Sequence, residues 1–169
     1  IGVIGVAPEA SLFGVKVLDR RGSGYTSDVA EGVRSCIRNN THIISMSLGS
    51  SQGSTLLHDA IKEAAAQGIL VIAAAGNDYG APVGYPAAFP EAIAVSATDS
   101  NNNLASFSNF GPEINFAAPG VNVLSTVKGG GYEAFNGTSM ATPHVSGVAA
   151  LMISSGMSSI KADDIGLSA

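Results

Sequence analysis

Apolar residues in this chain gather into short, nearly continuous runs, separated by stretches in which they recur at helical spacing. A continuous apolar run of strand length, bounded by turn residues, is typical of a β-strand buried on both faces. The sequence therefore predicts four buried strands, at residues 12–18, 43–48, 69–75 and 92–97, and shorter extended segments at 114–118 and 121–127.

Two stretches between these runs have the spacing of amphipathic helices. The first ends near Asn40, and either Thr26 or Ser27 could cap its start. The second opens at Ser54 and stops at Gly68. Their apolar stripes are Val29, Val33, Cys36 and Ile37 in the first helix, and Leu57, Ile61, Ala64 and Ala65 in the second.

Continuous apolar strands that alternate with helices indicate a parallel sheet, because parallel neighbours need crossover connections. Helices must then cover both faces of that sheet. We therefore expect a doubly wound, mainly parallel, three-layer α/β fold, with residues 1–169 forming one domain.

The composition argues against a disordered, a nucleic-acid-binding or a membrane-spanning chain. A content of 46% hydrophobic and 12% charged residues fits a chain with a large core rather than a disordered one. The net charge of −5 gives no reason to expect nucleic acid as a partner. No apolar run reaches the length of a membrane span, and the single cysteine, Cys36, is interpreted as a small buried hydrophobe.

The stretch from Gly137 to Gly147 runs into the apolar residues 148–153, which predicts a buried helix with Ser139 at its head. Pro143 fits the first turn of such a helix. Two interpretations of Ser139 follow. Its hydroxyl could cap the helix, or it could act beside the positive end of the helix dipole, where an oxyanion would be stabilised.

The residues Gly137-Thr138-Ser139-Met140-Ala141-Thr142-Pro143-His144 resemble the nucleophile motif of the subtilisin family of serine proteases. Further segments resemble that family in the same order and cover the chain to about Gly156. They are Gly5-Val6-Ala7-Pro8, Val15-Lys16-Val17-Leu18, Ser45-Met46-Ser47-Leu48-Gly49, Ala73-Ala74-Ala75-Gly76-Asn77, Gly84-Tyr85-Pro86-Ala87, Phe107-Ser108-Asn109-Phe110-Gly111 and Ala118-Pro119-Gly120.

The resemblance implies roles for individual residues in peptide-bond hydrolysis. Ser139 would be the nucleophile and Asn77 an oxyanion donor, although Asn77 could equally take the left-handed conformation of a turn after Gly76. The resemblance also implies that Thr138 assists the oxyanion site. The implied substrate-binding residues are Gly22, Ser23, Gly24, Ser47, Leu48, Gly49, Ala74 and Gly76. Asp78 is either a solvated carboxylate or a group that favours basic substrates.

The general base that would activate Ser139 is not found among the matched segments. A nucleophilic serine needs a histidine and an orienting acid, which precede the serine in this family. Neither His42 nor His58 has the family's surroundings; His58 is interpreted as a solvated surface residue, and His144 as structural. We expect the elements with the catalytic Asp and His to precede residue 1, so that this chain alone is nearly inactive. A noncatalytic peptide-binding module stays open, whereas an α/β-hydrolase esterase is excluded because its acid and base follow the serine.

The resemblance further implies structural Ca²⁺, with the backbone carbonyls of Ile1 and Val3 as part of an incomplete site. A second, weaker cation site would use carbonyls near Ala87 and Phe89. We also expect peptides or proteins as substrates, an inhibitory propeptide and a monomeric state of the complete enzyme. The family contains secreted and intracellular members, and we expect secretion without excluding an intracellular location.

Overall fold

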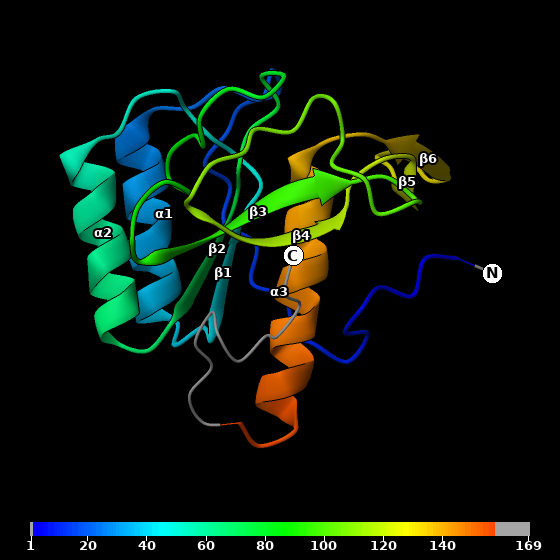
Figure 1. Cartoon of the computed structure of the whole chain (residues 1–169). Helices are drawn as coiled ribbons and strands as arrows, with labels where there is room; N and C mark the ends of the chain where they lie inside the picture. Colours follow the sequence, from blue (N-terminus) through cyan, green and yellow to red (C-terminus); the bar gives the residue numbers. More distant parts are fainter. Residues whose placement is uncertain (1, 158–169) are drawn as a thin grey trace.

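A four-stranded parallel sheet forms the middle of the computed structural model, which describes residues 2–157 (Figure 1). Its strands lie in the order of the chain: β1 (Ile43–Met46), β2 (Leu70–Ala74), β3 (Ala92–Thr98) and β4 (Ile114–Pro119). β2 and β3 are buried almost throughout, as strands covered on both faces must be. The predicted parallel sheet is confirmed.

Helices cover both faces of this sheet, and each face has its own core. α1 (Thr26–Arg38) and α2 (Thr55–Ala66) pack side by side on one face, and α3 (Thr138–Ser154) lies on the other (Figure 1). Ile61 and Val71 belong to the core under α1 and α2, whereas Ile72 and Val95 belong to the core under α3. Adjacent residues of β2 therefore point to opposite layers, and the predicted three-layer α/β architecture is confirmed.

The ends of α1 and α2 agree with the sequence pattern except at one cap. α1 is capped by Tyr25, without a side-chain hydrogen bond, so the prediction that Thr26 or Ser27 caps it is wrong. Ser54 is the N-cap of α2, and Gly68 ends the helix with a φ of 75°, a left-handed conformation that suits glycine. Cys36 is buried on the inner face of α1, as predicted, and burial raises the pKa of its thiol.

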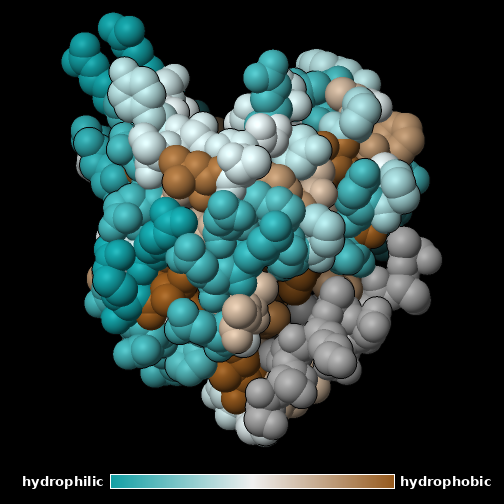
Figure 2. Space-filling model, turned by 90° about the vertical axis from the view of Figure 1, so that its left-hand side faces the viewer, coloured by the Kyte–Doolittle hydropathy of each residue, from teal (hydrophilic) through white to brown (hydrophobic). Residues whose placement is uncertain are grey.

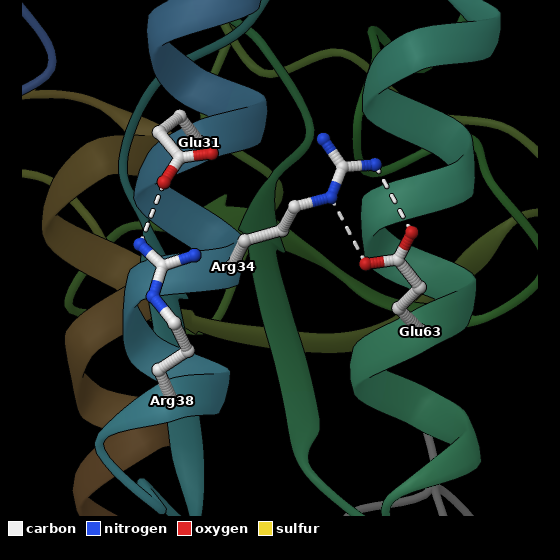
Figure 3. A network of polar contacts seen from close by, with 4 residues as sticks. All are labelled: Glu31, Arg34, Arg38 and Glu63. Atoms are coloured by element: carbon white, nitrogen blue, oxygen red, sulfur yellow. Dashed lines mark hydrogen bonds and ion pairs between the residues drawn. The ribbon is translucent and has the colours of Figure 1, made fainter.

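Charged side chains cover the outer surface of α1 and α2. Arg34 of α1 donates two hydrogen bonds of 3.0 Å to the carboxylate of Glu63 in α2, and Arg38 donates one to Glu31 within α1 (Figure 3). The bond from Arg34 is the main reason that the pKa of Glu63 is lowered. Figure 2 shows the molecule from the side on which α1 and α2 lie in Figure 1. This face is mainly hydrophilic, which is consistent with a solvated outer layer.

A separate antiparallel ribbon precedes α3. β5 (Val123–Thr126) pairs with β6 (Tyr132–Phe135), and the ribbon lies far from α1 and α2 (Figure 1). The extended segment at 121–127 is thus confirmed, but β6 was not predicted. Every residue of β6 is exposed, so it has no buried face from which a period of two could be recognised.

The strand predicted at residues 12–18 is wrong. These residues form no strand, and Leu12 is 95% exposed. A strand needs a neighbour for its backbone hydrogen bonds, and none of the described strands pairs with this stretch. Instead it borders a hollow of about 1200 Å³ that α1, β1 and α3 also line. The lining reaches Ser47 and Leu48 but includes neither Ser139 nor Asn77.

Candidate active site

Ser139 lies in the first turn of α3, but it does not cap the helix. The N-cap is Gly137, with a φ of 153° and no side-chain cap, and Ser139 is the second helical residue. The capping interpretation of Ser139 is therefore wrong. The half-buried serine is instead held at the positive end of a long helix, where backbone N–H groups have no helical partner.

Pro143 lies deeper in α3 than predicted. The helix begins at Thr138, so Pro143 is its sixth residue and not part of the first turn. Proline has no N–H to donate to the carbonyl four residues earlier, which is the carbonyl of Ser139. That oxygen accepts a hydrogen bond of 2.8 Å from the hydroxyl of Ser47, which follows β1. The serine of the motif is thereby tied to the end of the central sheet.

Asn77 follows the carboxyl end of β2, and its side chain is held by Thr138. Both the backbone N–H and the hydroxyl of Thr138 donate to the side-chain oxygen of Asn77, over 2.8 and 3.0 Å. A backbone N–H can only donate, so the atom facing Thr138 must be Oδ1. The Nδ2 amide group of this exposed residue therefore points away from Thr138 and stays a donor for another acceptor.

The space beside Gly137 connects this amide to Ser139. A Cβ atom placed on Gly137 would lie 3.6 Å from Asn77 Nδ2 and 3.6 Å from the backbone nitrogen of Ser139. Two N–H donors thus border one small space next to the serine, and glycine leaves that space open. Such a pair of fixed donors is what a developing oxyanion requires.

The alternative explanation for Asn77, a left-handed turn residue, is wrong. Among the described residues, the non-glycine positions with positive φ are Asn40, Tyr79, Asn102 and Asn122. In this loop the positive φ angles belong to Gly76, with a φ of 113°, to Tyr79 and to Gly80. Asn77 is therefore not needed for the turn.

None of the three histidines bonds Ser139 in the described part of the chain. The hydroxyl of Ser139 donates a long hydrogen bond of 3.4 Å to the carbonyl of Ser47. His144 bonds the carbonyl of Met140 through Nδ1 over 2.8 Å, so its predicted structural role is supported, and His42 is exposed. Among residues 2–157, no histidine therefore has a hydrogen bond through which it could accept the Ser139 proton.

The interpretation of His58 as a solvated surface residue is wrong. Its side chain is 25% exposed, bonds Glu91 over 2.8 Å and stacks on Phe89 with ring centroids 4.1 Å apart. Burial raises the pKa of Glu91, but the bonds from His58 and from its own backbone N–H outweigh this effect, and the pKa is lowered. This pair joins α2 to the residues before β3 and lies outside the site.

The residues expected to bind substrate fall into two groups in the structure. At or just after the carboxyl ends of β1 and β2 lie Ser47, Leu48, Ala74 and Gly76, with Gly49 next in the chain. The exposed turn Gly22-Ser23-Gly24 belongs to the loop before α1. Within that turn the N–H of Ser23 bonds the carboxylate of Asp19, and its carbonyl accepts the N–H of Asp19.

The residues expected near calcium lie partly outside the described part of the chain. Ile1 lies outside the described residues, and Val3 is exposed. Across residues 2–157, no three His, Cys, Asp or Glu side chains gather as a metal-binding group. The carbonyl of Phe89, expected in a second site, accepts the N–H of Ala92. Both cation sites therefore stay predictions.

Comparisons with known proteins decide the family. The model of the subtilase family matches residues 1–165 of the chain. The chain belongs to the subtilase family. It is 55% identical to alkaline elastase YaB from Bacillus sp. (strain YaB) over 152 residues, which are 90% of this chain and 40% of that protein. It is 56% identical to the thermostable alkaline protease of Halalkalibacterium halodurans, covering 90% of this chain and 42% of the relative.

A solved structure agrees with this assignment. The fold of this subtilase chain is similar to that described as "Structure of Prenylagaramide maturation protease PagA", with a TM-score of 0.75 and 33% sequence identity. The similarity covers 82% of this chain and 54% of that one. The subtilase chain thus spans about two fifths of the length of the curated relatives named above. Within residues 2–157, none of its helices has the length and apolar character needed to cross a bilayer.

Proposed function

We propose that this chain is part of the catalytic domain of a serine endopeptidase that hydrolyses peptide bonds through an acyl-enzyme on Ser139. The observation that supports this most directly is the pair of hydrogen bonds from Thr138 to Asn77 Oδ1. These bonds leave the amide donor of Asn77 beside the N-terminus of α3. The family membership and the names of the relatives, an elastase and a protease, support the same reaction class.

The proposed reaction uses the site in two steps. Ser139 Oγ attacks the carbonyl carbon of the substrate and gives its proton to a base, while Asn77 Nδ2 and the N–H of Ser139 stabilise the oxyanion. The C–N bond then breaks, and the amine leaves with the proton from the base. Water next attacks the acyl group, releases the acid and restores the hydroxyl. The base and its orienting acid are proposed to be an imidazole and a carboxylate outside this chain.

The test uses the full-length protein, meaning this chain together with any residues that accompany it in nature. We expect a fluorophosphonate probe to label it and a peptide anilide to be cleaved. Ser139→Ala should abolish both signals, and Asn77→Ala should lower kcat with little change in KM, because the donor acts on the transition state. Cleavage that survives Ser139→Ala in the purified protein would refute the proposed mechanism.

The second candidate function is a noncatalytic peptide-binding module on the same fold. It is favoured by one observation, that the hydroxyl of Ser139 bonds the carbonyl of Ser47 rather than an imidazole in the described residues. The same experiment separates the two functions. A full-length protein that binds peptides but neither cleaves them nor reacts with the probe is a binding module.

Further properties stay proposals that rest on the family resemblance. They are structural calcium bound outside the described residues, an inhibitory propeptide, extracellular location and a monomeric state. The predicted substrate residues Gly22, Gly24, Leu48 and Gly49 would bind the peptide backbone on the two sides of the site.

A further inference from the structure

Asn109 is a buried polar residue that the proposed mechanism does not use. Its exposed fraction is 1%, and it lies in the loop between β3 and β4, in the segment Phe107-Ser108-Asn109-Phe110-Gly111. Few asparagines are buried this completely, and those that are must have partners for their donors and acceptors. The partners of Asn109 show what it does.

Both neighbours of Asn77 in the chain are bonded to Asn109. The backbone N–H of Asn109 donates to the carbonyl of Gly76 over 2.9 Å. Its side-chain oxygen accepts the N–H of Asp78 over 2.7 Å. The peptide groups before and after Asn77 are therefore held by a single residue more than thirty positions further along the chain.

The side-chain amide nitrogen of Asn109 makes two further hydrogen bonds to the same loop. It donates to the Asp78 carboxylate and to the carbonyl of Pro82, each over 3.1 Å. Pro82 lies further along the same loop, so the loop is closed around the Asn109 side chain. The exposed Asp78 carboxylate therefore has a partner within the protein.

The fit around Asn109 is close on the side of Gly76. A Cβ atom on Gly76 would lie 2.4 Å from Asn109 Nδ2, a distance that side chains do not tolerate. Gly76 also has a φ of 113°, which disfavours any other residue. The loop can thus approach Asn109 only because residue 76 is glycine.

We propose that Asn109, paired with Asp78, is a positioning residue that fixes the backbone of Asn77 and thereby aims its amide donor at the oxyanion. Thr138 holds the side-chain end of Asn77, and Asn109 holds its backbone end. With one end released, the donor would turn away from the space beside Gly137. The role rests on the proposed function, since it concerns the oxyanion donor of that reaction.

The first test is a double-mutant cycle in the full-length protein with a peptide anilide substrate. We expect Asn109→Ser to lower kcat about tenfold and to leave KM within about twofold, because the donor matters mainly in the transition state. In the Asn77→Ala background, where there is no donor to aim, Asn109→Ser should lower kcat less than about twofold. Equal losses in both backgrounds would overturn the proposal.

Asn115→Ala is the matched control for lost stability. Asn115 also accepts a backbone N–H, that of Ala94 over 2.8 Å, but it belongs to β4 and bonds β3. We expect this variant to unfold at a lower temperature while its kcat stays within about twofold of the unchanged protein. A tenfold fall in kcat for Asn115→Ala would show that any weakening of the sheet has this effect, and it would overturn the specific role of Asn109.

Exchanging the carboxylate and the amide between positions 78 and 109 tests whether their hydrogen bond, rather than packing alone, positions Asn77. Asn109→Asp places a carboxylate opposite the Asp78 carboxylate and the Pro82 carbonyl, and we expect it to lower kcat at least as much as Asn109→Ser. Adding Asp78→Asn restores a donor and an acceptor between the two positions but leaves the Pro82 carbonyl without its donor, so we expect it to recover part of kcat. No recovery in the folded double variant would contradict the pairing.

Failure of this inference differs from failure of the proposed function. If Ser139→Ala and Asn77→Ala do not reduce hydrolysis, the proposed mechanism is wrong and the role of Asn109 falls with it. If both reduce hydrolysis but Asn109→Ser acts independently of Asn77, only the positioning role is wrong.

Discussion

The hydroxyl of Ser47 donates to the backbone carbonyl of Ser139 over 2.8 Å, at the position where Pro143 supplies no helical N–H. In an uninterrupted helix that carbonyl would accept the N–H four residues later. The proline therefore frees an acceptor, and a serine from the end of β1 uses it. The contact fixes the first turn of α3 against the sheet and with it the position of the candidate nucleophile.

This relationship predicts the effect of Ser47→Ala in the full-length protein. The variant leaves the Ser139 carbonyl without its partner, and we expect the free energy of unfolding to fall by about 1 kcal/mol. In a Pro143→Ala background the helix can donate to the same carbonyl, so Ser47→Ala should then have a smaller effect. Denaturant unfolding of the four proteins measures the coupling. Equal losses in both backgrounds would show that Pro143 is unrelated to this bond.

Gly137 gives a prediction about activity. In Gly137→Ala the new methyl group would lie 3.6 Å from both Asn77 Nδ2 and the Ser139 nitrogen, where the substrate oxygen is proposed to sit. We expect kcat/KM for a peptide anilide to fall at least about tenfold, partly from this obstruction and partly from strain at a φ of 153°. Gly129→Ala, which also has a positive φ but no neighbouring atoms, is the control for strain. Similar losses in the two variants would leave no special role for the space beside Gly137.

The pair His58 and Glu91 predicts a loss of stability in acid. The pKa of Glu91 is lowered in the folded state from 4.5, so its contribution is present above that pH and disappears as pH falls through the folded pKa. We expect Glu91→Gln to reduce the free energy of unfolding by about 1 kcal/mol at neutral pH and by progressively less below about pH 4.5. Glu133→Gln, on the exposed strand β6, is the control. A difference between Glu91→Gln and the unchanged protein that stays constant down to about pH 3 would contradict the linkage.

The chain by itself should be nearly inactive. Serine without a base is a weak nucleophile, and none of the described histidines bonds Ser139. We expect purified residues 1–169 to show no more labelling by a fluorophosphonate probe than their Ser139→Ala variant, under conditions where the full-length protein is labelled. Strong labelling that depends on Ser139 in the isolated chain would mean that a base lies within it.

The fold was predictable where buried elements have a regular pattern of apolar residues in the sequence. The strands β2 and β3 are continuous apolar runs because both of their faces are covered, and the amphipathic helices α1 and α2 have one covered face each. The stretch 12–18 shows the limit of this reasoning. An apolar run indicates what could be buried, but only a neighbouring strand makes it part of a sheet.

The candidate site was predictable from motifs, but its internal contacts were not. Ser139, Asn77 and Thr138 followed from the family resemblance, and the structure brings Asn77 and Thr138 into contact across 61 positions of the chain. The motif around Asn109 was recognised without a role, because its contact with Asp78 depends on two loops meeting in space. The release of the Ser139 carbonyl by Pro143 could have been found by counting four residues back from the proline.

The bond between Thr138 and Asn77 also has a consequence for the stage of folding at which the candidate site forms. Because the donor is oriented only after α3 has docked on the sheet, a half-folded chain has a serine but no aligned oxyanion donor. On the proposed function, such intermediates could not digest their neighbours while those neighbours are still unfolded and most easily cut. If the proposed function holds, assembly of the site from distant segments delays proteolytic activity until the molecules are compact enough to resist it.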